Sequence, residues 1–150
     1  MLLAAVVLIL GALYTYFSDV QAEQLRLQTA LVAHALETEG VSYFDDLDTS
    51  DRRITWIAAD GTVLYDSRSD SGVMENHLER EEVKAALATG SGTSFRYSDT
   101  LMERYIYTAQ RLSDGTVLRL SAAQNTVPHL VLGVVKPIIL VIGIAVALSA

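Results

Sequence analysis

Charged residues divide this chain into three parts. All 18 acidic residues lie between Asp19 and Asp114, whereas residues 1–17 and 138–150 carry no charged side chain. A helix needs roughly 20 consecutive apolar residues to cross a bilayer. The pattern therefore predicts a folded middle part between two transmembrane helices, at residues 1–17 and 130–150.

The first apolar stretch ends in Tyr14, Tyr16 and Phe17, where an aromatic belt would meet the lipid headgroups. It is slightly short for a span and has no basic residues before it, so we expect a few N-terminal residues to be missing. A cleaved secretory signal is the alternative, although no small-x-small cleavage site follows the stretch.

Lys136 and Pro137 mark the expected outer boundary of the second span, because a lysine stem reaches the headgroups and proline suits a first helical turn. The apolar run then continues to Ala150 without stop-transfer charges. Because a lipid-facing helix that ends inside the bilayer leaves polar groups unsatisfied, we expect the chain to be a fragment of a longer protein. That protein would be a multi-pass protein of the cell membrane, with residues 18–130 outside the cytoplasm.

Composition excludes several classes of function. The net charge of −7 would repel nucleic acid. The absence of cysteine removes disulfides and thiol chemistry. Asp66, Glu75 and His77 have side chains of the kind that bind metals, but the sequence does not bring them together, and we expect no metal site. We also expect no catalytic residues.

Residues 18–39 have the periodicity of a helix that continues out of the first span, and Gly40 is its expected end. Apolar side chains cover about half of its circumference, which is wider than a coiled-coil seam. Such a face can pack on a sheet and on a partner helix at once. The sequence therefore predicts a homodimer through the extracytoplasmic helix 18–40, formed by Leu25, Leu27, Leu31, Val32 and Leu36.

Two Asp-Gly pairs, Asp60-Gly61 and Asp114-Gly115, each lie between runs that alternate in polarity. This pairing is typical of a two-residue hairpin turn. We therefore expect two hairpins with the same turn chemistry. Their strands are expected at residues 53–59, 62–66, 104–111 and 116–122.

A helix at residues 79–88, closed by Gly90, and a strand at 93–98 are expected between the hairpins. Antiparallel strands joined by hairpins, with helices on one face, form an α+β domain. The fold class expected for residues 41–126 is α+β, with a PAS-like five-stranded antiparallel sheet. A long N-terminal helix precedes it, and a transmembrane helix flanks it on either side.

Residues 54–125 resemble the extracytoplasmic input domain of phosphate-regulon-type (PhoR-like) sensor histidine kinases. The resemblance is carried by Asp66-Ser67, Met74-Glu75-Asn76-His77, Arg80-Glu81-Glu82-Val83 and Arg96-Tyr97-Ser98. Glu81 replaces the proline that this family has at the start of the helix.

The resemblance implies that the chain is the signal-input module of a two-component sensor histidine kinase, which relays ligand or envelope state to a cytoplasmic kinase core. The core would hold a phosphorylatable histidine and an ATP-binding domain, and would act on a response regulator. ATP and Mg²⁺ are expected only there, so this chain needs no cofactor. His34, His77 and His129 all precede the second span, so none of them suits the phosphoacceptor.

Other outputs stay open. The same module would suit a chemotaxis-type receptor or a cyclic-dinucleotide enzyme. A membrane-tethered binding module without signalling output is the alternative from a different class. The expected partners are the lipid bilayer, a second copy of the chain, and an unidentified extracytoplasmic ligand or protein.

The candidate ligand-binding residues combine cations with aromatic rings. A guanidinium group pairs with carboxylate or phosphate at two points, and a histidine responds to mild acid. The structural alternatives are that arginines pair with the surplus acids, that tyrosines form cross-strand pairs, and that His77 braces its loop. Arg80, Arg96 and Arg104 are candidates for an anion clamp. The ligand-binding set is Tyr65, Asp66, His77, Arg80, Arg96, Tyr97 and Tyr107.

Overall fold

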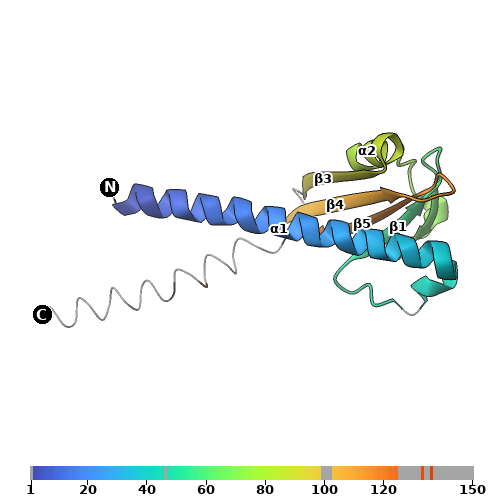
Figure 1. Ribbon diagram of the computed structural model, residues 1–150, viewed down its shortest axis with the longest axis horizontal. Helices are drawn as coiled ribbons and strands as arrows, with labels where there is room; N and C mark the ends of the chain where they lie inside the picture. Colours follow the sequence, from blue (N-terminus) through green and yellow to red (C-terminus); the bar gives the residue numbers. More distant parts are fainter. Residues whose placement is uncertain (1, 46, 99–102, 125–132, 134–135, 137–150) are drawn as a thin grey trace, which may run out of the picture. The chain divides into compact units, whose positions relative to one another are not determined.

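A computed structural model describes residues 2–45, 47–98, 103–124, 133 and 136. The chain divides into two compact units, Val20–Gln124 and a unit made of Met1–Asp19 and Asn125–Ala150. The elements, in chain order, are α1 (Leu2–Glu39), η1 (Val41–Phe44), β1 (Arg53–Ile57), β2 (Val63–Asp66), η2 (Ser71–Val73), α2 (Glu81–Thr89), β3 (Ser91–Ser98), β4 (Glu103–Arg111) and β5 (Val117–Ala123) (Figure 1).

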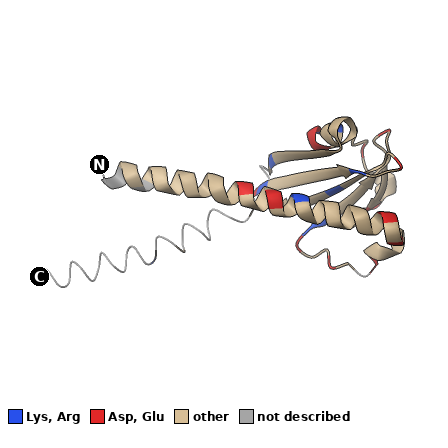
Figure 2. Cartoon of the chain, in the orientation of Figure 1, with Lys and Arg blue, Asp and Glu red and all other residues tan. Residues whose placement is uncertain are grey.

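Helix α1 is a single helix whose first charged residue is Asp19 (Figure 2). Gly40 follows it with φ of 76°, and the Gly40 N–H donates to the Leu36 carbonyl at 3.0 Å. The expected helical stretch and its glycine end are therefore confirmed. None of the helices among the described residues is both long and apolar enough to cross a membrane. The expected second span lies outside the described residues, apart from Gly133 and Lys136.

The strands form one antiparallel sheet in the order β2-β1-β5-β4-β3. The first two strands pair as a hairpin, and the last three form a meander whose end, β5, lies beside β1. The expected α+β class, with five antiparallel strands and a long N-terminal helix, is confirmed.

The two Asp-Gly turns have the same hydrogen bonds, as expected, but each loop has three residues rather than two. The Ala58 N–H donates to the Thr62 carbonyl at 2.8 Å, and the Leu112 N–H donates to the Thr116 carbonyl at 2.8 Å. The glycine in each loop has a positive φ, 88° in the first and 85° in the second. A glycine in this conformation is typical of the last position of a three-residue hairpin loop. Each loop is therefore one residue longer than predicted.

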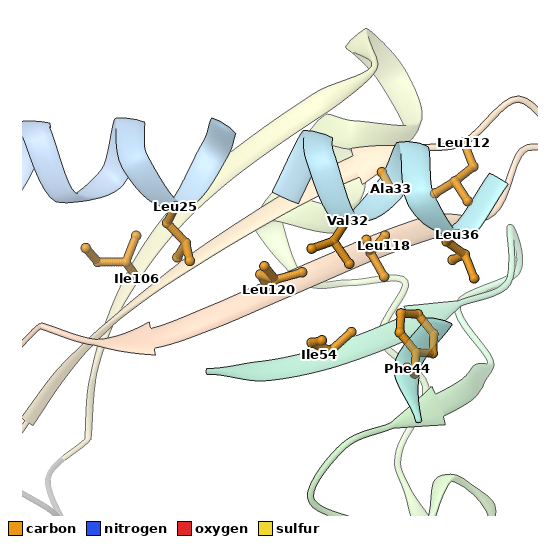
Figure 3. Packing of buried hydrophobic residues seen from close by; sticks show 10 residues of the cluster. All are labelled: Leu25, Val32, Ala33, Leu36, Phe44, Ile54, Ile106, Leu112, Leu118 and Leu120. Carbon is orange, nitrogen blue, oxygen red and sulfur yellow. The ribbon is translucent and has the colours of Figure 1, made fainter. Parts of the chain in front are cut away.

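One face of the sheet packs against α1. Leu25, Val32 and Leu36 of the helix contact apolar side chains of β1, β4 and β5 (Figure 3). The opposite face packs against α2, through Val83 and Ala86, so helices cover both faces of the sheet and not one face as expected. The core is therefore divided into two layers by the sheet. Its larger layer consists of Leu25, Val32, Ala33, Leu36, Phe44, Ile54, Ile106, Leu112, Leu118 and Leu120.

Helix α2 begins two residues later than expected, because Arg80 still has an extended backbone with φ of −72° and ψ of 131°. Its inward-facing residues and its end at Gly90, which has φ of 98°, agree with the prediction. Strand β3 begins at Ser91, two residues before the expected start. A side-chain carbon at Gly92 would overlap the backbone carbonyl of Glu82, so glycine here allows β3 to approach α2 closely.

Candidate functional site

A cavity of about 470 Å³ lies against the face of the sheet that carries α2. Its volume is within the range of small-molecule sites, which is roughly 300–1,000 Å³. Basic and aromatic side chains dominate its lining. The lining residues are Arg53, Met74, Glu75, His77, Arg80, Arg96, Tyr97, Tyr105, Tyr107 and Arg119.

Arg119 of β5 is the most buried cation of the cavity, with 4% of its surface exposed. Its Nη2 donates to the Thr55 hydroxyl at 3.1 Å, and its Nη1 donates to Glu82 at 3.4 Å. Its Nε has no hydrogen-bond partner among the described residues. Burial lowers the pKa of the Arg119 guanidinium, and the Glu82 carboxylate opposes that effect. The group stays a cation, because an arginine pKa starts far above neutral pH.

Glu82 of α2 is the acid that holds this cation and its neighbour. Its carboxylate is fully buried and accepts from the Ser94 hydroxyl at 2.6 Å, from Arg96 and, more weakly, from Arg119. Burial raises the pKa of this carboxyl, but the hydrogen bonds from Arg96 and Ser94 outweigh burial and leave the pKa below its ordinary value. Glu82 is therefore ionised.

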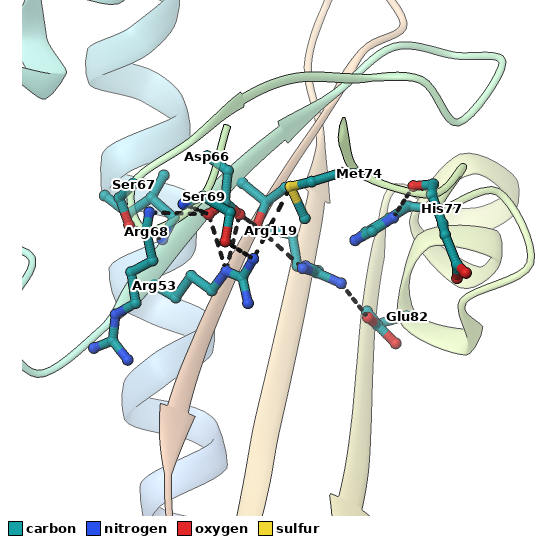
Figure 4. A network of polar contacts seen from close by, with 12 residues as sticks. Arg53, Asp66, Ser67, Arg68, Ser69, Met74, His77, Glu82 and Arg119 are labelled. Atoms are coloured by element: carbon teal, nitrogen blue, oxygen red, sulfur yellow. Dashed lines mark hydrogen bonds and ion pairs between the residues drawn. The ribbon is translucent and has the colours of Figure 1, made fainter. Parts of the chain in front are cut away.

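Asp66, at the end of β2, pairs with Arg53. The Arg53 Nε donates to both carboxylate oxygens at 2.9 and 3.0 Å, and the Thr55 hydroxyl donates to one of them at 2.8 Å. Burial raises the Asp66 pKa, but these donors and the Arg68 backbone N–H bring it below the ordinary value. Thr55 thus links this pair to Arg119, in one network that reaches Glu82 (Figure 4).

His77 is 5% exposed and both lines the cavity and anchors its loop. Its backbone N–H donates to the Gly61 carbonyl at 2.8 Å, and its ring Nδ1 lies 2.7 Å from the Glu75 carbonyl. Because a carbonyl only accepts, Nδ1 carries the proton. Burial and then the charge of Arg119 lower the His77 pKa, whereas the Glu75 carbonyl raises it. His77 therefore braces its loop, as the structural alternative expected, and also lines the cavity.

Arg80 precedes α2 and is partly exposed. Within the described part of the chain, no carboxylate lies within ion-pair distance of its guanidinium. Two tyrosines, Tyr105 and Tyr107, have ring centres 6.4 Å apart at the cavity wall. The Arg96 guanidinium carbon lies 4.1 Å from the centre of the Tyr107 ring, and that of Arg119 lies 5.4 Å from it. The ring therefore holds two guanidinium groups in place.

Most of the predicted ligand-binding set comes together here. Asp66 does not line the cavity and lies behind it, paired with Arg53. Five of the seven candidates line the cavity together: His77, Arg80, Arg96, Tyr97 and Tyr107.

Besides Asp66, Tyr65 of this set and Arg104 of the candidate anion clamp lie elsewhere. Tyr65 faces the α1 side of the sheet, where its ring stacks on Phe44 with centres 4.7 Å apart. Arg104, expected in the anion clamp, lies with its guanidinium carbon 4.9 Å from the centre of the Phe95 ring and does not line the cavity. In both cases the strand alternation decides, because successive side chains point to opposite faces.

Arg119, Arg53, Tyr105 and Glu82 were missed as site residues. Arg119 stands in the otherwise apolar run Val117–Leu120, where a lone charge facing the core must have a buried partner. Glu82 lies four residues before Ala86, on the inward face of its helix. Both signals are visible in the sequence, but their pairing depends on contacts between distant elements.

Only part of the predicted dimer face is exposed. Leu25, Val32 and Leu36 are buried in the domain's own core, so they are not available to a partner. Leu27 and Leu31 are 51% and 69% exposed. The homodimer stays a prediction, and only these two of the five residues can form it.

The cavity brings basic and aromatic side chains together, which suits the binding of a ligand. The Ser67 hydroxyl accepts from the Ile54 N–H at 3.0 Å, as a structural bond within the hairpin. Among the residues described, no three His, Cys, Asp or Glu side chains are placed to hold a metal ion. Three guanidinium groups of the lining, those of Arg53, Arg96 and Arg119, are held by hydrogen bonds.

Comparison with known proteins gives low similarities. No protein-family model and no curated protein matches the sequence. The extracellular domain of rpHK1S-Z16, described as a histidine kinase, is similar over 57% of this chain and 36% of its own, with 14% identity and a TM-score of 0.43. The YkuI protein of Bacillus subtilis, which has an EAL domain and was solved with c-di-GMP and calcium, is similar over 77% of this chain and 37% of its own, with 10% identity and a TM-score of 0.43. The chain thus spans little more than a third of the length of either structure.

Proposed function

We propose that residues 20–124 form the extracytoplasmic input domain of a membrane receptor, and that the receptor is a two-component sensor histidine kinase of the phosphate-regulon type. The motif from Asp66 to Ser98 supports the family. The antiparallel sheet with a helical insert between β2 and β3 supports a PAS-like domain.

The observation that carries this proposal is that a single sheet separates the basic cavity from α1. On β4, Tyr107 lines the cavity, and the next residue, Thr108, hydrogen-bonds Thr29 of α1. On β5, Arg119 lines the cavity between Leu118 and Leu120, which pack in the α1 layer. A ligand that shifts the cavity face therefore also shifts the strands on which α1 rests.

Helix α1 is one helix from Leu2 to Glu39, with its charge-free part at residues 2–18. We propose that residues 1–17 cross the membrane and that a second span lies within 130–150, after the end of β5 at Ala123. A shift of the sheet against α1 would then reach both spans as a piston, tilt or rotation. Such a switch requires two packings that differ in ligand affinity.

A second copy of the chain would complete the module. Leu27 and Leu31 are spaced one helical turn apart and form an apolar strip on the exposed side of α1. Burying this strip against the same strip of a partner would bring two first spans side by side. We propose that the kinase core is part of the same protein and that a response regulator is its partner.

The continuation of the reading frame beyond Ala150 tests the proposal. A dimerising helix with a phosphorylatable histidine, followed by an ATP-binding domain, is the expected result. A chemotaxis-type or cyclic-dinucleotide output domain would keep the input role and replace the kinase. A stop codon, or a short basic tail, would overturn the receptor and leave a membrane-tethered binding module.

A further inference from the structure

The buried guanidinium of Arg119 has incomplete hydrogen bonding. A guanidinium carries five N–H donors, and only Thr55 and Glu82 accept from this one among the described residues. The contact with Glu82 is long, at 3.4 Å. A buried donor that lacks an acceptor costs free energy, and a buried charge costs more. The site therefore gains from a further acceptor.

The charges around the cavity point the same way. Four guanidinium groups line it, whereas the buried carboxylates of Asp66 and Glu82 are already engaged by Arg53, Arg96 and Arg119. Glu75, the one acid among the described residues that line the cavity, is exposed. Arg80 has no carboxylate partner in the described part of the chain. Among the described residues, the cavity consequently holds more positive than negative charge.

Two of these cations, Arg96 and Arg119, are also held in place before any ligand binds. Arg96 is fixed by Glu82 on one side and by the Tyr107 ring, 4.1 Å away, on the other. Arg119 is fixed by Thr55 and lies beside the same ring. Fixed donors lose little conformational entropy when a ligand arrives, which favours affinity.

We infer that this cavity binds a small oxyanion, a polycarboxylate or a phosphate, through Arg80, Arg96 and Arg119. Guanidinium groups match both chemistries, because each oxyanion presents paired oxygens to the planar fork. The inference deepens the proposed function by naming the class of signal. The binding itself does not depend on the receptor role.

Isothermal titration tests the inference. The full chain, kept in a nonionic detergent at constant ionic strength, is titrated with citrate, with inorganic phosphate and with neutral succinamide. Saturable heat is expected with citrate, with phosphate or with both, and none with succinamide. Binding of citrate alone assigns a carboxylate ligand, and binding of phosphate alone assigns a phosphate ligand.

Two matched variants locate the binding. Arg80→Gln removes a partly exposed cation of the cavity, so the fold is retained, and the dissociation constant should rise about tenfold or more, the loss expected for one charge-assisted hydrogen bond. Arg52→Gln makes the same charge change at an exposed position outside the cavity, and should leave the constant unchanged.

The inference is overturned if neither anion gives saturable heat, or if Arg80→Gln and Arg52→Gln weaken binding equally. Its failure is distinct from failure of the proposed function. Anion binding by a chain whose reading frame ends in a short tail keeps the site and removes the receptor. A kinase core after residue 150, in a chain that binds neither anion, keeps the receptor and removes the site.

Discussion

The hydroxyl groups of Thr29 on α1 and Thr108 on β4 hydrogen-bond each other in the buried interface between helix and sheet. The Thr29 hydroxyl lies 2.8 Å from the Leu25 carbonyl and the Thr108 hydroxyl lies 3.5 Å from it, so one hydroxyl donates to the carbonyl and the other supplies the proton of the shared bond. Apolar contacts tolerate sliding better than a directional bond does. This pair therefore fixes the position of α1 along β4, on the strand that also carries Tyr107 of the cavity.

Replacing Thr108 with valine keeps the shape of the side chain and removes the hydroxyl that Thr29 bonds. The free energy of unfolding should fall by about 1 kcal/mol, the net value of a typical hydrogen bond, with more lost if Thr29 does not adjust. Urea unfolding of the full chain in detergent measures the change. Thr93→Val, at an exposed position of β3, is the matched control and should change stability by less than about 0.5 kcal/mol. Equal effects of the two variants would contradict the role given to Thr108.

Gly92→Ala tests the close approach of β3 to α2. The added carbon would overlap the Glu82 carbonyl, so the strand or the helix must move, at a cost of about 1–3 kcal/mol. Gly72→Ala is the control, because its added carbon meets only the Asp70 carboxylate at ordinary contact distance, 3.4 Å. Thermal unfolding compares the two variants. A stable Gly92→Ala chain would show that α2 is not seated as described.

Acid should destabilise the domain, with a first loss that comes from His77. Its pKa is lowered from 6.5 in the folded chain, so below pH 6.5 the unfolded chain takes up the proton more readily. Stability is therefore complete above that value and falls as the pH drops toward the folded pKa. The pKa values of Asp66 and Glu82 are also lowered in the folded chain, from 3.8 and 4.5. Protonation of these two carboxylates therefore adds a second loss of stability in stronger acid.

His77→Asn retains an N–H donor for the Glu75 carbonyl and removes the titration. The difference in unfolding free energy between pH 7.5 and 5.5 should therefore shrink, as measured by urea unfolding at both values. His34→Asn, on the exposed side of α1, should leave that difference unchanged. If both variants behave alike, His77 is not the source of the loss.

The exposed strip of α1 predicts a dimer that one charge disrupts. The chain has no cysteine, so Gln24→Cys, on the same side of α1 as Leu27 and Leu31, supplies a single crosslinking site. Leu31→Asp should lower disulfide crosslinking sharply, because a buried unpaired charge costs several kcal/mol. Leu64→Asp, an exposed leucine of β2, should not. Crosslinking that persists with Leu31→Asp would remove the dimer.

Local signals in the sequence predict the elements well. The periodicity of residues 18–39, the Asp-Gly pairs and the glycine after α2 each give the right element, within about two residues at the ends. Alternation also assigns the faces of β1, with Ile54 in the α1 layer and Ile57 in the α2 layer. The three-residue loops differ from the prediction by one residue, because Asp-Gly is compatible with both lengths.

The site is harder to predict, because its key contacts join distant positions. Arg119 and Glu82 are 37 residues apart, and Arg119 and Thr55 are 64 apart. Strand order brings Arg119 and Thr55 together, since β5 lies beside β1, and the packing of α2 on the sheet brings Glu82 to Arg119. Tyr65 was included in the predicted site but does not belong to it. It adjoins Asp66 in the sequence, but its side chain faces the other side of β2.

Determining on which side of the membrane the domain lies tests the proposed receptor most directly. Asp51→Cys gives the full chain one exposed thiol in the loop before β1. A membrane-impermeant maleimide is applied to intact cells and, as a control for reactivity, to lysed cells. Labelling in intact cells to the same extent as after lysis is the expected result. Labelling that requires lysis would contradict the proposed receptor.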